Sequence, residues 1–488
     1  MKNLTSLLFA AVAAASVQAA TVDRVIVRQQ WPWHTGIKVE YALSGMTGAV
    51  DVGVKVYRDG VLVEGIPSTA FVGDVFNVTD DVGSFTIDAA AVFGSDSVRT
   101  RNLRVELTLT ESEAKMGEVL YKIFDLDTGA CTDVTRADLL NGKYGSYETD
   151  YSKIGKGYQD KPFTTALDDV LIWTGVTNNI AYKTSKLVMR KIHAKDKVWQ
   201  SGDPSGAEVT YAMAARTQYW NKFTYDYYIA VFETTLAQYK KIAGSYPTGY
   251  VKASGDEDFI SAANMIYHYS VVGNQSSEKG KVSPDEIVCF PTNSYVRDVG
   301  KSSSVAGKMW DKTGIEFTLP TIAEWEFACE GGNSGVLYSG LASGMTVNKE
   351  QLGWVKSNAG GEIHRVGEKP CNAYGLYDML GNAMERVLGG GSLNEGGESG
   401  TGASADDPVV NPLGNPNRDG NTHPTFCGGC WGASDPVQLI NDYCSVNSLR
   451  HAARHSGYVE WFSTRDYMGF RFVMPARADG QWADHPVK

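Results

Sequence analysis

One twenty-residue stretch of the sequence, NAYGLYDMLGNAMERVLGGG at positions 372–391, gathers residue types that could hold a metal ion. Two carboxylates, Asp378 and Glu385, flank a turn that contains Gly381. Calcium takes roughly six to eight oxygen ligands in tolerant geometry, and glycine adopts backbone conformations that other residues resist. Judged from the residues alone, however, two ordinary surface carboxylates on a braced turn are the better interpretation.

Cysteine is the second residue type here with its own chemistry. The chain has seven, which is too few for a disulfide scaffold, and the odd number leaves at least one thiol unpaired: Cys131, Cys289, Cys329, Cys371, Cys427, Cys430 and Cys444. Cys329, in the segment AEWEFACEGG, has apolar neighbours on an expected helix, so we predict a buried free thiol there.

Three of these cysteines and one histidine form a group with two competing interpretations. Cys427, Cys430, Cys444 and His451 are typical zinc or copper ligands, and the Cys-x-x-Cys spacing of the first two suits a metal. The alternative is a Cys427–Cys444 or Cys430–Cys444 disulfide beside a partly exposed histidine. We prefer the disulfide, because exported chains favour oxidised cysteines.

Export is predicted from the first residues of the chain. Lys2 gives a basic start, LLFAAVAAAS is a short apolar run, and VQA supplies small residues before a cleavage after Ala19. We therefore predict a signal peptide over residues 1–19 and a final location in the periplasm, on the cell surface or outside the cell. The apolar run is too short to cross a bilayer, and no later run is longer, so no transmembrane segment is expected.

Composition limits the class of protein. A chain of 488 residues is too long to fold around a single hydrophobic core, so two or three domains are expected. The formal net charge of −11 argues against nucleic acids and anionic membranes as partners. The 52 glycines, 25 tyrosines and 11 tryptophans indicate a loop-rich fold in which aromatic rings hold irregular backbone.

The N-terminal part alternates apolar and polar residues in short runs. Segments such as IKVEYAL, VDVGVKVY and NLRVELTLT fit half-buried strands. We predict a small antiparallel sandwich of immunoglobulin or fibronectin type over residues 20–112, serving as a spacer or attachment module. Residues 113–184 are expected to be a connecting segment packed on the next domain.

From residue 185 onward, short helices with clear start signals are separated by long irregular stretches. Thr235 and Gln238 form one capping box, with Gly244 as the stop, and Thr321 with Glu324 forms another. Gly331 is expected to end the second helix. The pattern predicts an α+β, loop-rich domain over residues 185–476, followed by a tail at 477–488.

Several pieces in fixed order carry a family resemblance. They are YYIAVFETTLAQY (227–239), FTLPTIAEWEFACEGG (317–332), NAYGLYDMLGNAMERV (372–387), and GGCWG, LRHAAR and MGFRFV within 428–473. The sequence resembles the sulfatase-modifying factor domain family, which has the fold of formylglycine-generating enzyme. The resemblance covers residues 185–476 and implies a C-type-lectin-like fold.

The oxidase members of that family bind copper through two cysteines five residues apart, just before an Ala-Ala-Arg turn. Here the turn is 452–454, and the ligand positions fall on Val446 and His451, neither of which is cysteine. Because soft thiolates are what suit Cu(I), the resemblance implies that copper and the oxidase activity have been lost.

The same resemblance gives the Gly-Asn turn a role. Carried over by position, it implies a structural calcium ion held by the side chains of Asp378 and Glu385 and the carbonyls of Gly381 and Ala383. Other positions depart from the family: Arg386 stands where tryptophan is frequent. Thr318 stands where arginine is usual.

These observations favour an exported, non-catalytic protein that binds an unidentified protein or glycan. Candidate ligand-binding residues near the former active-site groove are Trp431, Arg450, His451 and Arg454. Internal packing and salt bridges are the alternative role for these residues. Two other functions stay open: a metal-dependent oxidase of the formylglycine-generating type with relocated ligands, and a purely structural cell-surface component.

Overall fold

The computed structural model describes residues 20–30, 34–94, 101–150, 170–201, 219–272, 304–331, 336–338, 341–342, 353–388, 399–412, 425–432 and 466–477. The chain forms two compact units. The first consists of residues 1–118 and 135–144, and the second of residues 119–134 and 145–488. No helix in the described ranges combines the length and the apolar character needed to cross a membrane.

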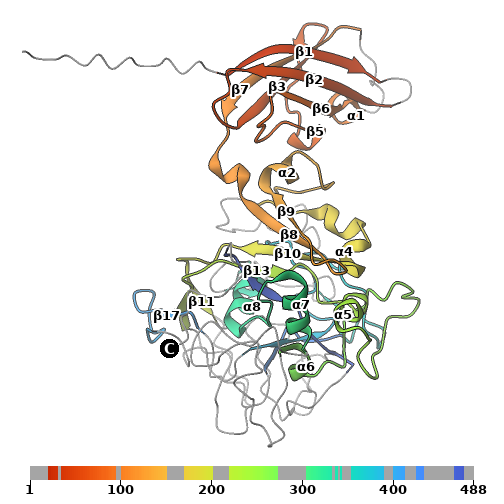
Figure 1. The fold of residues 1–488 in the computed structure, drawn as a ribbon, viewed down its shortest axis with the longest axis vertical. Coiled ribbons are helices and arrows are strands. Elements are labelled where there is room, and N and C mark those ends of the chain that lie inside the picture. The colour runs from red at the N-terminus through yellow and green to blue at the C-terminus, as the bar shows by residue number, and fades with distance from the viewer. Residues whose placement is uncertain are drawn as a thin grey trace, which may run out of the picture. The chain divides into compact units, whose positions relative to one another are not determined.

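The N-terminal unit contains two antiparallel sheets, drawn in red and orange in Figure 1. One has the order β1-β2-β6-β5, with β1 at Thr21–Gln29, β2 at Gly36–Ser44, β6 at Val82–Asp88 and β5 at Phe71–Gly73. The other has the order β4-β3-β7, with β4 at Val61–Leu62, β3 at Val50–Arg58 and β7 at Leu103–Glu111.

The two sheets share one apolar core. In β2 every second residue is buried, namely Ile37, Val39, Tyr41 and Leu43, as the two-residue period of a strand requires. Valines of β3 and residues of β6 complete the same cluster. The predicted strands are thus present in two facing layers, while the immunoglobulin or fibronectin type of the sandwich stays a prediction.

Short helices close this unit. The 3-10 turns η1 (Ser68–Ala70) and η2 (Ala114–Gly117) and the helices α1 (Ala89–Phe93) and α2 (Arg136–Leu140) connect or follow its strands. A capping box of Thr135 and Asp138 starts α2. The side chain of Asn141, just after α2, accepts hydrogen bonds from the backbone N–H groups of Val75 and Phe76.

The second unit is built on a five-stranded sheet with the order β20-β13-β10-β8-β9. Its strands are β20 at Val473–Pro475, β13 at Tyr227–Ala230, β10 at Lys186–Ile192, β8 at Val119–Asp125 and β9 at Cys131–Thr135. The predicted connecting segment therefore supplies β8 and β9. Since Leu120, Tyr121, Ile123 and Phe124 are all buried, β8 is a covered inner strand.

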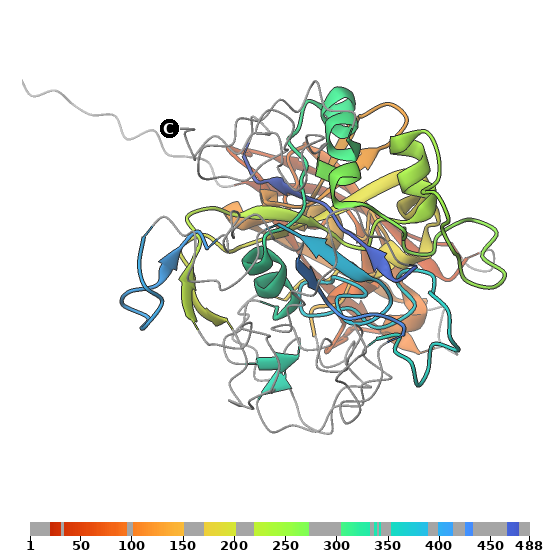
Figure 2. The same ribbon diagram turned by 90° about the horizontal axis from the view of Figure 1, so that it is seen from below.

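Helices and small sheets surround this sheet, as seen from below in Figure 2. The helices are α4 (Ala181–Thr184), α5 (Leu236–Ala243), α6 (His268–Val272), α7 (Val305–Thr313) and α8 (Ile322–Cys329), with the 3-10 turn η3 at Thr174–Asn178. One small sheet joins β11 (Val198–Ser201), β12 (Tyr219–Lys222) and β17 (Val409–Val410). A second pairs β14 (Val336–Tyr338) with β15 (Leu341–Ala342). Another joins β18 (Thr425–Cys427), β16 (Met384–Val387) and β19 (Met468–Gly469).

Both predicted capping boxes are present. Thr235 and Gln238 bond reciprocally at the start of α5, and Thr321 and Glu324 do so at the start of α8. Gly244 takes a left-handed φ of 92° directly after α5. Gly331, two residues beyond the end of α8, likewise has a φ of 69°.

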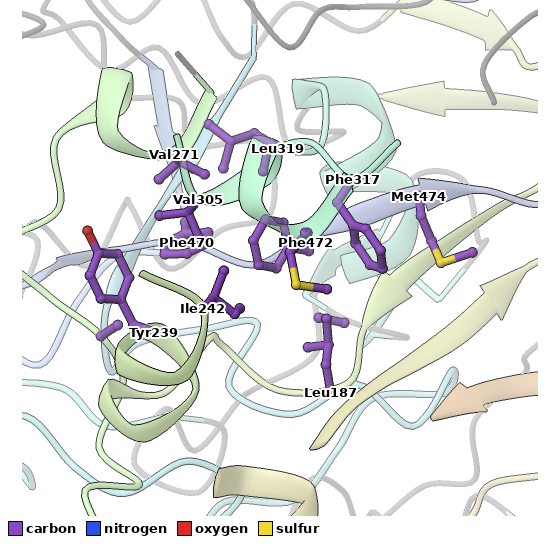
Figure 3. Close-up of a cluster of buried hydrophobic side chains, with 14 of the residues drawn as sticks. Leu187, Tyr239, Ile242, Val271, Val305, Phe317, Leu319, Phe470, Phe472 and Met474 are labelled. Atoms are coloured by element: carbon purple, nitrogen blue, oxygen red, sulfur yellow. The ribbon is translucent and has the colours of Figure 1, made fainter. Parts of the chain in front are cut away.

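Aromatic and aliphatic side chains fill the space between the sheet and helices α5 and α7. Figure 3 shows Phe317, Phe470 and Phe472 packed with Leu187, Leu319 and Met474. Phe317 meets Phe472 edge to face, with ring centroids 5.6 Å apart. This core fixes the C-terminal segment 468–475, which also carries Arg471 into the interior.

A buried charge network at the Gly381 turn

The predicted turn is held in an unusual backbone conformation. Asp378, Gly381 and Asn382 all have positive φ, at 55°, 80° and 54°. A Cβ at position 381 would lie 2.4 Å from the carbonyl oxygen of Trp354, so only glycine fits. The same carbonyl accepts a hydrogen bond from the Asn382 backbone N–H at 2.9 Å.

Glu233, in the loop between β13 and α5, holds the far side of this turn. Its Oε2 accepts a hydrogen bond of 2.6 Å from the Asn382 side chain, and its Oε1 accepts one of 2.9 Å from the Ala383 backbone N–H. The Asn382 Oδ1 in turn accepts from the His364 backbone N–H at 2.9 Å. One carboxylate and one amide therefore fix the turn between segments distant in sequence.

Glu385 on β16 forms a bidentate ion pair with Arg471. Arg471 donates from Nε to Glu385 Oε2 and from Nη2 to Oε1, both at 2.6 Å. Trp325 Nε1 also donates to Oε2, at 2.8 Å. Glu385 is 1% exposed and Arg471 is 0% exposed, so the pair is completely removed from water. Such a pair is geometrically specific and strongly destabilising to break.

Asp378 is less completely satisfied. Its Oδ2 accepts a 2.6 Å hydrogen bond from the Gly367 N–H, whereas its Oδ1 is buried and has no hydrogen-bond partner within the described part of the chain. Burial raises the pKa of Asp378 to about 6, although the Gly367 N–H and the charges of Arg471 and Lys183 oppose the rise. The site thus contains one carboxylate oxygen that lacks a donor.

Burial shifts the protonation of several groups in the network. Burial raises the pKa of Glu233 well above its usual value, and the charges of Asp378 and Glu385 raise it further against the opposing effect of Arg471. Burial also lowers the pKa of Lys183, against the attraction of Asp378 and Glu368. The raised pKa favours the neutral form of Glu233, so the three buried carboxyl groups of Glu233, Asp378 and Glu385 do not carry one negative charge each.

The arrangement fits a hard cation at Asp378. Calcium prefers carboxylate and carbonyl oxygens, and the unpartnered Asp378 Oδ1 lies in the same turn as the carbonyls of Gly381 and Ala383. Glu385 Oε1 accepts one hydrogen bond, from Arg471 Nη2, and a carboxylate oxygen has room for a second contact. No group of three or more His, Cys, Asp or Glu side chains among the described residues is arranged to hold a metal. Calcium at this turn stays a prediction.

Of the predicted ligand-binding residues, the structure places Trp431. It is half-buried in the turn after β18, and its backbone N–H donates to the Asn382 carbonyl at 2.8 Å. Trp431 is therefore tied to the Gly381 turn. Arg450, His451 and Arg454 lie outside the described residues.

The cysteines divide into two states. Cys329 is a buried free thiol, which confirms the prediction for that residue. Cys427 is also a buried thiol outside any disulfide, whereas Cys430 is disulfide-bonded. The Cys427–Cys444 pairing is thus absent here, and a metal site using both Cys427 and Cys430 would first require reduction. Cys444 lies outside the described residues.

The two departures from the family pattern are both interior positions. Arg386 is 0% exposed, donates from Nε to the Ile266 carbonyl at 2.8 Å and lies 4.8 Å from the centre of the Phe426 ring. Burial lowers its pKa to about 9. Thr318 is buried and exchanges two backbone hydrogen bonds with Val473. These residues therefore pack the domain.

Sequence reasoning missed the partners of the predicted acids: Glu233, Trp325 and Arg471. Each stood in a segment that carried the family resemblance, namely YYIAVFETTLAQY, FTLPTIAEWEFACEGG and MGFRFV. For Glu233 and Arg471 the available signal was a charged residue inside a largely apolar run, since such residues are rarely buried unless they are paired.

Comparison with known proteins identifies the family. Residues 202–476, more than half of the chain, match the model of the sulfatase-modifying factor enzyme 1-like domain. The chaperone protein LppX of Paenibacillus barcinonensis is 26% identical over 183 residues, which cover 33% of this chain and 61% of that protein. The formylglycine-generating enzyme of Mycobacterium tuberculosis is 36% identical over 81 residues, covering 14% and 25% respectively. The chain therefore spans less than two thirds of either relative.

Two solved structures are also similar. Treponema denticola variable protein 1 aligns with 59% of this chain and 95% of its own length, at 18% identity and a TM-score of 0.39. PvdO from Pseudomonas aeruginosa aligns with 59% of this chain and 93% of its own length, at 16% identity and a TM-score of 0.39. On the strength of the match over residues 202–476, this chain belongs to the sulfatase-modifying factor enzyme 1-like domain family.

Proposed function

We propose that this chain is an exported, non-catalytic member of the family whose loop-rich domain binds a protein or a glycan. One observation carries the proposal. The copper-ligand positions hold Val446 and His451, while Trp325, Glu385 and Arg471 are engaged with one another in the interior. The residues that support the fold are kept, and the thiolates that would carry the oxidation are replaced.

A calcium ion at the Gly381 turn would be structural in this proposal. Asp378 would hold it with one carboxylate oxygen, and the carbonyls of Gly381 and Ala383 and the side chain of Glu385 would contribute further oxygens. The ion would place a positive charge beside the Asp378 oxygen that has no donor within the described residues, and it would hold a turn that has little regular secondary structure around it.

A protein is the first ligand class to test. The relative named as a chaperone supports this choice, although the alignment covers only 61% of that protein. Trp431 is the best-placed anchor among the described residues, because it is half-buried and its backbone is fixed by Asn382. Tryptophans of this kind are common binding anchors.

The activity test is direct. The mature chain, supplied with copper and oxygen, is incubated with a sulfatase-type peptide that contains the target cysteine. Mass spectrometry should show the cysteine unchanged. Conversion to formylglycine would disprove the non-catalytic assignment and would restore the alternative of an oxidase with relocated ligands.

The binding test uses arrays of defined glycans and purified exported proteins. Trp431→Ala should weaken a bound ligand at least about tenfold, a loss of roughly 1.4 kcal/mol. Trp220→Ala, which removes a half-buried tryptophan on β12, should not weaken it. If Trp431→Ala and Trp220→Ala bind the ligand equally well, Trp431 is not part of the site. If the parent chain binds nothing on either array, the purely structural role is favoured.

A further inference from the structure

One charged side chain of the central sheet is buried with nitrogen atoms that have no hydrogen-bond partner among the described residues. Arg190 on β10 is 5% exposed, and its guanidinium carbon lies 4.7 Å from the centre of the Tyr121 ring on the neighbouring strand β8. Its Nε and Nη1 atoms are buried, and neither has a hydrogen-bond partner within the described ranges.

Arg471, another buried arginine of this unit, has hydrogen-bond partners for its guanidinium nitrogens. Its Nε, Nη1 and Nη2 atoms all donate hydrogen bonds to Glu385 or to backbone carbonyls. A guanidinium group stays charged inside proteins, and a buried charge is costly unless it is paired and hydrogen-bonded. The ring of Tyr121 supplies a cation–π contact, but a ring face does not satisfy the N–H donors of Arg190.

Two tyrosine hydroxyls lie within electrostatic reach of Arg190. Burial raises the pKa of both Tyr121 and Tyr374, and the charge of Arg190 opposes the rise in each. The Tyr374 hydroxyl is buried and has no partner among the described residues. The Tyr121 oxygen accepts from the Trp173 N–H at 3.2 Å, which leaves its proton able to donate. The donors in this cluster thus outnumber the acceptors.

Asp226, the acid that acts on Tyr374, does not supply the missing acceptors. Asp226 acts electrostatically on Tyr374, but its Oδ1 accepts from the Lys195 N–H at 3.0 Å. Its Oδ2 lies 3.6 Å from Lys191 Nζ. Asp226 is therefore engaged by the Lys195 backbone and the Lys191 side chain, and within the described residues it forms no ion pair with Arg190.

We propose that Arg190, with the hydroxyls of Tyr374 and Tyr121, binds a small oxyanion: sulfate, phosphate or a carboxylate. An oxyanion supplies the missing negative charge and several acceptor atoms at once, and the planar guanidinium matches its geometry. A water molecule would supply acceptors but no charge. This site is separate from the Gly381 turn, and the proposal does not depend on the binding function proposed above.

The test compares sodium sulfate, phosphate and acetate with sodium chloride at equal ionic strength, using the mature full-length chain. Sulfate and phosphate also stabilise folded proteins in general, so the informative quantity is the difference between variants. Arg190→Met should abolish the increase in melting temperature that exceeds the chloride value. It should also raise the melting temperature in chloride, because an unpaired buried charge has been removed.

Lys122→Met is the matched control. It removes one positive charge next to Tyr121 on β8, where the side chain points to the other face and pairs with Asp133, and it should leave the oxyanion effect intact. An oxyanion effect that is as large in Arg190→Met as in the parent chain overturns the proposal. If Arg190→Met does not fold, Arg190→Lys and Tyr374→Phe give the answer.

Tyr374→Phe should fold, because it removes only an unpartnered hydroxyl, and titration calorimetry should show about tenfold weaker binding of the oxyanion. Arg190→Lys keeps the charge but loses the planar fork, and it should bind more weakly still. Crystals soaked in selenate should show anomalous density beside Arg190. Ordered water alone at that position, together with unchanged affinities in both variants, would overturn the proposal.

Discussion

At the scale of single residues, the two acids of the Gly381 turn differ in how their charges are matched. Glu385 is paired with Arg471 through two hydrogen bonds. Asp378 keeps one oxygen without a donor within the described part of the chain. We therefore expect the two positions to respond differently to substitution and to added calcium.

Glu385→Gln should lower the free energy of unfolding by about 3–5 kcal/mol whether or not calcium is present, because it leaves Arg471 buried and unpaired. The control is Asp127→Asn, which breaks an exposed pair with Lys241 and should cost less than about 1 kcal/mol. Urea unfolding in calcium and in chelator measures both. A Glu385→Gln loss that appears in calcium alone would contradict the structural role of the ion pair.

Asp378→Asn should keep the hydrogen bond from Gly367 and lose the response to calcium. In the parent chain, calcium that binds only the folded state should add roughly 2.7 kcal/mol at a hundredfold excess over Kd. Magnesium should add less, since it resists irregular carbonyl coordination. The measurement is the melting temperature of each variant in calcium, magnesium and chelator. An unchanged parent melting temperature in chelator would remove calcium from this turn.

Gly381→Ala tests the backbone of the turn. The substitution combines a left-handed φ of 80° with a Cβ only 2.4 Å from the Trp354 carbonyl, so we expect a loss of roughly 2–4 kcal/mol. Gly360→Ala is the control, because Gly360 has a φ of 65° but nothing within 4 Å of a Cβ. Its loss should stay near 1–2 kcal/mol, roughly the cost of left-handed backbone alone. Equal losses would show that the turn relaxes away from Trp354.

At the scale of elements, the segment 353–367 braces the turn through a stack of side chains. The ring of His364 lies 3.6 Å from the ring of Trp354 with an 8° angle between the planes, and Lys369 Nζ lies 3.9 Å from the Trp354 ring centre. Both groups face the indole closely, so they occupy its opposite faces. Burial lowers the pKa of His364, but the Glu368 carboxylate and the Ala359 carbonyl raise it more.

This stack predicts a pH dependence. Because the pKa of folded His364 is higher than that of the unfolded chain, its contribution to stability is fully present below the unfolded pKa. The contribution is then lost as the pH rises through the folded value. Glu368→Gln should therefore reduce stability at low pH and have a smaller effect at high pH. Urea unfolding at intervals between pH 5 and pH 9 measures the difference, and a difference that grows with pH would contradict the assignment.

Local elements were accessible from the sequence, and long-range pairs were not. The capping boxes at Thr235 and Thr321 were predicted because every interacting group lies within three residues. The partnership of Glu385 with Arg471 joins residues 86 positions apart, and that of Glu233 with Ala383 joins residues 150 apart. The periodicity of apolar residues carries no information about contacts between residues so far apart in the sequence. The strands β8 and β9 were likewise assigned to a connection, because β8 joins β9 to the rest of the sheet through β10, which follows about sixty residues after β8.

At the scale of the whole molecule, the first prediction concerns its start. The basic residue, short apolar run and small residues at 17–19 predict a mature N-terminus at Ala20. Mass spectrometry of the protein purified from its native host measures this directly. A chain that still begins with Met1 would show that the segment is not removed. In the structure, β1 begins at Thr21, directly after the predicted cleavage.

The path of the chain between the two units has a consequence for how they are inherited. The chain leaves the first unit after residue 118, returns to it over 135–144, and leaves it again. The returning piece contains α2 and Asn141, whose side chain holds the backbone of Val75 and Phe76. A recombination event that transferred residues 20–112 alone would lose the hydrogen bonds that Asn141 makes to Val75 and Phe76. The strands β8 and β9 would stay with β10 in the original protein. Because β8 also pairs with β10 and the same sheet ends at β20, we expect the two units to be exchanged together, with exchange points outside residues 20–475.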